Sequence, residues 1–274
     1  MCRNVFLVLV PMCAAVGACC AAPKVPAEWG ERWQPVLPQQ ERHPSLFVDD
    51  SDRERMRARI AEAPYADWWA RVRRTSTRAA PAFVWWLTGD EAAAQRARDD
   101  LVQKPIWRQQ PEGYLEPSSH RFADYVTAYD FLAGWQGLSA ADAALIRRRI
   151  AEEADHYYEA LGNVAGGRNY GNQRTLAASA LGLAALALCQ HTGSAHAPAE
   201  WLARALYEIR RDENWWFWRP GGLYVEGLGY TTYMNLQFVP FAIAYERATG
   251  RYLLDEPRLR EWLAFAAYQV QANG

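Results

Sequence analysis

Apolar residues recur every three to four positions along most of the chain, which is the spacing of an amphipathic helix. No run of alternating apolar and polar residues predicts a strand. Pro64 interrupts the first helical pattern, and Pro240 is expected to kink the last long one. The predicted helices are residues 53–63, 67–75, 81–88, 91–103, 120–135, 140–161, 174–190, 198–210, 226–248 and 257–272. The pattern therefore predicts an all-α protein.

Helices of two kinds alternate in this pattern. Residues 140–161 form a charged amphipathic helix, and Ser139 with Asp142 resembles a capping box before it. Residues 174–190 are apolar almost throughout, and a helix that is apolar on every side is buried on every side. Outer half-solvated helices and inner buried helices fit two concentric layers. We expect an incomplete (α/α) toroid of paired antiparallel helices over residues 43–274.

The N-terminus has the pattern of a bacterial export signal over residues 1–22. Arg3 precedes an apolar run that is too short to cross a bilayer. Residues 16–19 (VGAC) resemble a lipobox, which would make Cys19 the lipidated residue; cleavage by an ordinary signal peptidase is the alternative. We expect an exported protein, either periplasmic or anchored by its lipid as an outer-membrane or cell-surface lipoprotein. Residues 23–42 are expected to form a linker or a strap over the surface.

Composition excludes some partners and some kinds of site. The net charge is −1, so no global field attracts nucleic acid, and an acidic ligand would need a local cluster of donors. Four of the five cysteines lie in the signal, which leaves Cys189 alone. We expect Cys189 to be a small buried hydrophobic residue. The five histidines match no metal-ligand spacing, so we expect neither a metal nor another cofactor.

A polar loop precedes the most apolar helix, at residues 166–174 (GGRNYGNQR). Polar loops at the ends of buried helices are good candidates for function. This one offers the amides of Asn169 and Asn172 and the guanidinium groups of Arg168 and Arg174. The alternative is that Asn172 is only a helix N-cap among ordinary loop glycines.

A second unusual stretch is GGLYVEGLGYTTY, residues 221–233. In a helix, Glu226, Tyr230 and Tyr233 fall at positions i, i+4 and i+7 and share one face. The alternative is a core tyrosine whose hydroxyl is satisfied by Glu226.

Several aromatic residues and one histidine are further candidates for the site. Thirteen tryptophans and fourteen tyrosines suit a large core or a groove that stacks sugar rings. Trp215, Trp216 and Trp218 precede the tyrosine stretch and serve either as such a platform or as packing. His120 begins a predicted helix, from which it can reach a groove.

Four stretches together resemble the helical domain of the heparinase II/III-like polysaccharide lyases and related alginate lyases. They are HPSLFVDDSDRERMRARI, TAYDFLAGWQGLSAADAALIRRRI, RNYGNQ and GGLYVEGLGYTTY, in the family's order between residues 43 and 250. The resemblance implies β-elimination at a uronic acid, without a metal. Amide or cationic donors neutralise the sugar carboxylate, a base removes the C5 proton and an acid protonates the leaving oxygen.

The resemblance also implies roles for individual residues. Asn169 is the expected neutraliser of the carboxylate, with Asn172 as the alternative, and Tyr230 is the base, the acid or both. A phenol is mostly protonated at neutral pH, so a basic role needs a nearby cation from one of the loop arginines. The expected substrate-binding side chains are Arg168, Tyr170, Arg174, Glu226, Tyr233, His120 and Trp216. The expected partner is an acidic polysaccharide or oligosaccharide.

The chain departs from the family in two places. Tyr170 stands where many members have a histidine directly after the asparagine. Members also carry a β-sandwich domain after the helices, whereas this chain ends at Gly274, so we expect a truncated lyase.

Two rival interpretations stay open at this stage. A glycoside hydrolase would use two carboxylates, for example Asp124 or Asp130 with Glu226. A non-catalytic glycan-binding lipoprotein would need only aromatic and amide groups.

Overall fold

The computed structural model describes residues 22–106, 116–163, 171–211 and 228–257, together with residues 260, 261 and 264. Within these ranges the chain forms nine α-helices and short 3-10 helices, and it contains no strand. The predicted all-α class is therefore confirmed for this part of the chain. The helices are α1 (Arg53–Arg59), α2 (Tyr65–Val72), α3 (Ala79–Thr88), α4 (Glu91–Gln103), α5 (Glu116–Leu132), α6 (Ala140–Gly162), α7 (Gly171–Ala187), α8 (Pro198–Arg210) and α9 (Leu228–Thr249).

Local signals account for some of the helix boundaries. Ser139 caps α6, since its side chain accepts a hydrogen bond from the N–H of Asp142 at 3.1 Å. Asp90 caps α4 in the same way through the N–H of Ala93. Pro64 separates α1 from α2, whereas Pro240 lies inside α9 without ending it. The predicted starts of α4 and α6 are therefore close to the observed ones, whereas α5 and α7 begin and end about three or four residues earlier than predicted.

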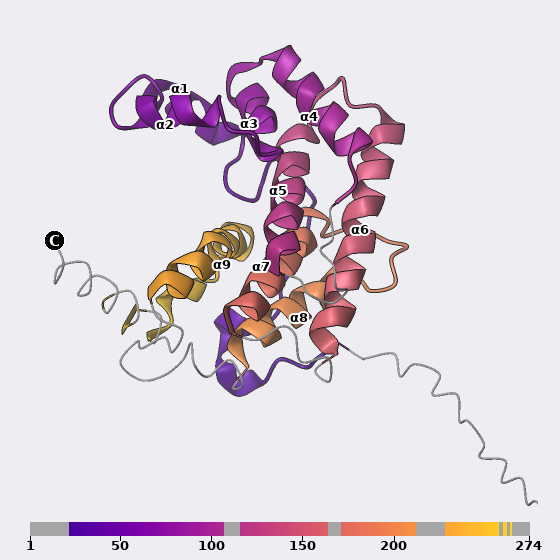
Figure 1. Cartoon of the computed structure of the whole chain (residues 1–274). Coiled ribbons are helices and arrows are strands. Elements are labelled where there is room, and N and C mark those ends of the chain that lie inside the picture. The colour runs from indigo at the N-terminus through magenta and orange to yellow at the C-terminus, as the bar shows by residue number, and fades with distance from the viewer. Residues whose placement is uncertain are drawn as a thin grey trace, which may run out of the picture.

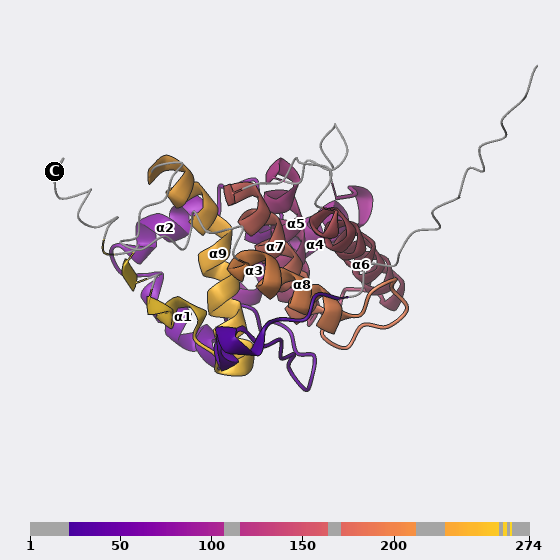
Figure 2. The ribbon, with the colours of Figure 1, turned by 90° about the horizontal axis from the view of Figure 1, so that it is seen from below.

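The helices pack in two rows. Helices α3, α5, α7 and α9 form one row in which each packs against the next, and α4, α6 and α8 form the other. In both views α7 lies between α9 on one side and α6 on the other (Figures 1 and 2). This alternation between rows matches the predicted alternation of buried and half-solvated helices.

Helices α7 and α9 run parallel to each other. Gly182 in the second half of α7 faces Phe241 in the second half of α9, and Leu186 and Ala248 near the ends of the two helices line one cleft. Every residue of α7 from Thr175 to Ala187 is buried, as its uniform apolarity predicts. The first turns of α7 and α9 therefore lie at the same end of the row.

Residues 23–42 form a strap that packs on the helices. Trp33 is fully buried, and its indole N–H donates to the carboxylate of Glu256 at 3.2 Å. The hydroxyl of Tyr245 in α9 donates to the carbonyl oxygen of Gln34 at 2.7 Å. These contacts make residues 23–42 part of the core. Of the two alternatives that the sequence offered, they favour a strap over a linker.

The predicted export signal and its Cys19 lie outside the described residues. Among the helices that are described, none combines the length and apolarity needed to cross a bilayer. Cys189 is half-buried, so the expectation of a buried residue holds only in part. Burial, together with the charge of Glu41, raises the pKa of its thiol to about 11.

Candidate functional site

Polar side chains from the first turns of α5 meet polar side chains from the first half of α9. The ring of His120 in α5 lies 4.9 Å from the ring of Tyr233 in α9, at an angle of 55°. Nδ1 of His120 lies 3.0 Å from Nε2 of Gln237, one turn after Tyr233. We call these three residues the His120 cluster. The structure thus brings together two residues, His120 and Tyr233, that sequence analysis selected from segments more than 100 positions apart.

Two buried amides near this end have unsatisfied atoms. Gln237 is 4% exposed, and its Oε1 has no hydrogen-bond partner among the described residues. Asn172 in the first turn of α7 is 3% exposed, and its Nδ2 likewise has no acceptor in the described part of the chain. A buried polar group without a partner costs about 1–3 kcal/mol. Such atoms are suited to a polar ligand.

Tyr230 lies in the first turn of α9 and is 55% exposed. Its spacing to Tyr233 and Gln237 is i, i+3 and i+7, which places the three on one side of the helix. Within the described ranges its hydroxyl makes no hydrogen bond, either to Asn172 or to Arg174. Tyr230 therefore lies beside the His120 cluster with a solvent-accessible phenol.

Arg174 has a different environment from the one that substrate binding requires. Its guanidinium is buried, pairs with Glu208 and donates to the carbonyl oxygen of Leu161 at 2.6 Å. Arg204 and Arg211 also lie on the same carboxylate, at 3.4 and 3.1 Å. These contacts join α7 to α6 and α8, so the observed role of Arg174 is in helix packing.

Five of the predicted site residues lie outside the described residues. They are Arg168, Asn169, Tyr170, Trp216 and Glu226.

The carboxylates of the hydrolase alternative are used by the fold. Asp124 accepts hydrogen bonds from the backbone N–H groups of Arg78 and Ala79 and so holds the start of α3. Asp130 is fully buried and accepts from the N–H groups of residues 45 and 46 and from His43. Both aspartates fix backbone segments, which removes the main support for a hydrolase.

Sequence reasoning missed Gln237. Its signal was present, because the spacing of Tyr230 and Tyr233 continues to Gln237 on the same helical face. A glutamine in an apolar helix is chemically unremarkable until its partner is known, and that partner comes from α5.

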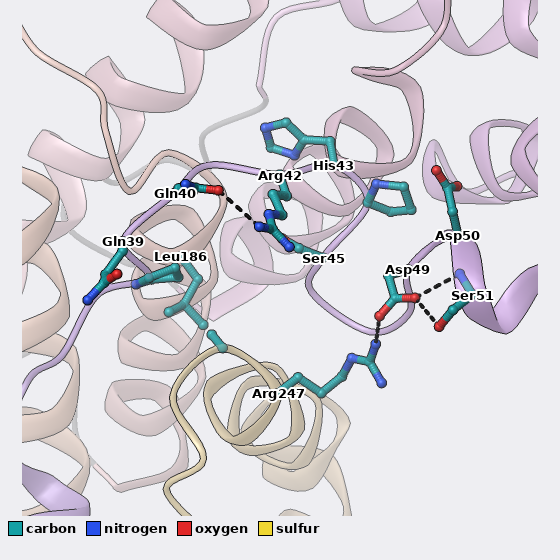
Figure 3. Close-up of a pocket in the computed structure, with 13 residues that line it drawn as sticks. Gln39, Gln40, Arg42, His43, Ser45, Asp49, Asp50, Ser51, Leu186 and Arg247 are labelled. Atoms are coloured by element: carbon teal, nitrogen blue, oxygen red, sulfur yellow. Dashed lines mark hydrogen bonds and ion pairs between the residues drawn. The ribbon is translucent and has the colours of Figure 1, made fainter.

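A separate cleft of about 800 Å³ lies near the ends of α7 and α9 (Figure 3). Ala248 of α9 lines it, and this residue lies roughly 16 Å along the helix from Gln237, at about 1.5 Å per residue. Arg42 and Arg247 also line it, and there Arg42 donates to Gln40 and Arg247 pairs with Asp49. The cleft is therefore remote from the His120 cluster.

In the part of the chain that the structure describes, no three His, Cys, Asp or Glu side chains are grouped to hold a metal ion.

Comparison of the sequence with protein-family models and with curated proteins gives no match. The likeness to the lyases therefore rests on the four sequence stretches and on the chemistry of the residues near the His120 cluster.

Proposed function

We propose that the protein is a polysaccharide lyase that cleaves a uronic-acid-containing glycan by β-elimination. The observation that carries the proposal is the meeting of His120 from α5 with Tyr233 and Gln237 from α9. The buried amide of Asn172 and the exposed phenol of Tyr230 lie in the first turns of parallel helices at this end. Amide, imidazole and phenol are the groups that elimination next to a carboxylate needs.

The proposed reaction needs neither water nor an oxidant. The amide of Asn169 or Asn172 neutralises the C6 carboxylate, onto which negative charge moves when the C5 proton leaves. Tyr230 takes that proton as its phenolate. The C4–O bond then breaks, its electron pair stays on the leaving oxygen, and a double bond forms between C4 and C5. The leaving oxygen is protonated by Tyr230 or by a second acid.

Tyr230 needs a nearby cation to act as a base. Arg174 is engaged by Glu208 and the carbonyl oxygen of Leu161, so it does not support that role. Arg168 is the remaining proposed cation. Tyr170, Glu226, Tyr233, His120 and Trp216 are proposed to contact the sugar chain.

An incomplete (α/α) toroid is proposed as the architecture. The alternation of helices between two rows and the parallel course of α7 and α9 support it, since inner helices of a toroid run parallel. Export and lipidation at Cys19 belong to the same proposal, because polymers of uronic acids are met outside the cytoplasm.

Absorbance tests this function directly. A lyase produces an unsaturated uronate that absorbs in the far ultraviolet, and a hydrolase does not. We expect absorbance to rise with alginate, hyaluronan, chondroitin or heparan as substrate. Replacing Tyr230 with Phe should lower kcat by roughly 10²-fold or more while glycan binding is kept.

Tyr252→Phe is the matched control. Tyr252 is 57% exposed, much as Tyr230 is, but it follows the end of α9 and so lies far from the His120 cluster. This variant should keep full activity. Turnover that survives in Tyr230→Phe removes Tyr230 from the mechanism. Glycan binding by the parent protein without turnover supports a non-catalytic binder, and chain cleavage without absorbance supports a hydrolase.

A further inference from the structure

The contact between Gln237 and His120 bears on which nitrogen of the imidazole carries the proton. The amide nitrogen of Gln237 faces Nδ1 of His120 at 3.0 Å. An amide nitrogen can only donate a hydrogen bond, so Nδ1 accepts it and carries no proton. The proton of the neutral ring is then on Nε2.

The surroundings hold this amide in place. Gln237 is almost fully buried in the middle of α9, which restricts its side chain to few rotamers. The ring of Tyr233 packs on the imidazole from one turn before Gln237, at 4.9 Å. His120 is therefore fixed by two side chains from a single helical face.

We propose that Gln237 is a positioning residue that holds His120 as the neutral imidazole with its proton on Nε2. In this state Nε2 is the donor nitrogen of the ring. The catalytic value of this tautomer rests on the proposed function, whereas the tautomer itself does not.

Nitrogen-15 NMR of the full chain tests the tautomer without any substrate. The protein has five histidines, so the signals of His120 are assigned by their loss in a His120→Asn variant. At neutral pH we expect one protonated nitrogen at Nε2 and one unprotonated nitrogen at Nδ1. A proton on Nδ1 in the parent protein, or an imidazolium there, overturns the proposal before any further variant is made.

Variants of Gln237 give the second arm of the test. Gln237→Leu removes the donor, so the Nδ1-protonated tautomer should become populated. Gln237→Glu offers only acceptors at neutral pH, so it should move a proton onto Nδ1. Asn235→Leu is the matched control, because Asn235 lies two positions earlier on α9 and so on another side of the helix. A tautomer that stays unchanged in both Gln237 variants overturns the proposal.

Activity measurements separate this inference from the proposed function. If the parent turns over a uronate polymer, Gln237→Leu should lower kcat by roughly 10²-fold with KM little changed. Unchanged kcat with an altered tautomer removes the catalytic part of the proposal. A parent without turnover that keeps the Nε2 tautomer overturns the lyase and leaves the positioning role of Gln237 in place.

Discussion

At the scale of single residues, His43 ties the N-terminal segment to the helices. Its Nδ1 lies 2.8 Å from Asp130 in α5, and its Nε2 lies 3.2 Å from Glu41, which also pairs with Arg147 in α6. Burial by itself would lower the pKa of His43, but the hydrogen bonds and charges of Asp130 and Glu41 raise it to about 9. Burial would raise the pKa of Glu41, but His43 and Arg147 lower it to about 2.

These shifts predict how stability depends on pH. The raised pKa of His43 gives a contribution that is complete below pH 6.5 and is lost as pH rises towards about 9. The lowered pKa of Glu41 gives one that is complete above pH 4.5 and is lost as pH falls towards about 2. The free energy of unfolding should therefore fall by about 1–3 kcal/mol between pH 6.5 and 9, measured by chemical denaturation.

The variant His43→Gln tests whether His43 causes the predicted loss of stability at alkaline pH. It should be less stable at pH 6 and should lose most of the alkaline decline. His191→Gln is the control, since burial lowers the pKa of that half-buried histidine instead of raising it. An alkaline decline of the same size in His43→Gln would show that another group is responsible.

At the scale of elements, α7 packs against α9 through a glycine. A Cβ on Gly182 would lie 2.3 Å from Cε2 of Phe241, a ring that is fully buried. Real Cβ contacts are not that short, so the close approach of these helices requires glycine here. Helical pattern and propensity predict α7 but not this requirement, because glycine lowers helix propensity and its benefit comes only from the neighbouring helix.

Two helical glycines should respond to alanine with opposite signs. Gly182→Ala should destabilise the protein by about 1 kcal/mol, because overpacking outweighs the gain in helix propensity. Gly229→Ala should be neutral or stabilising by a few tenths of a kcal/mol, because open space surrounds that exposed position at the start of α9. Thermal or urea denaturation measures both.

A double-mutant cycle with Phe241→Leu tests whether the cost of Gly182→Ala comes from its contact with Phe241. The cost of Gly182→Ala should shrink when Phe241 is already replaced by the smaller leucine. An equal cost in both backgrounds would show that the two residues are not coupled.

At the scale of the whole molecule, the strap of residues 23–42 packs against residues near the other end of the described chain. Trp33 pairs with Glu256 and is fully buried, and Trp29 stacks on Tyr207 of α8 at 5.6 Å. The guanidinium of Arg210 lies over the ring of Trp29 as well, at 5.4 Å. The strap therefore contributes to the same core as α8 and α9.

Removing the buried indole tests this contribution. Trp33→Ala should lower the free energy of unfolding by about 3–5 kcal/mol, the usual cost of deleting a buried tryptophan. Trp68→Ala is the control, since Trp68 is exposed on α2 and its loss should cost far less. Urea denaturation compares the two. Equal midpoints for both variants would show that the strap does not stabilise the helices.

The sequence by itself determined the elements of this protein. The helical class, the start of α6 at the cap Ser139 and the burial of α7 follow from local sequence, because apolar spacing and caps depend on residues close in the chain. Part of the candidate site was also predictable, because His120, Tyr230 and Tyr233 are polar residues at the starts of apolar helices.

The tertiary structure alone decided which residues meet. Gln237 became a partner of His120, Arg174 became part of an ion cluster on Glu208, and Asp130 became the anchor of His43. The physical reason is that these partners lie 117, 34 and 87 positions apart. Periodicity and capping depend on neighbours within a few residues, whereas these contacts form only when separate helices pack side by side.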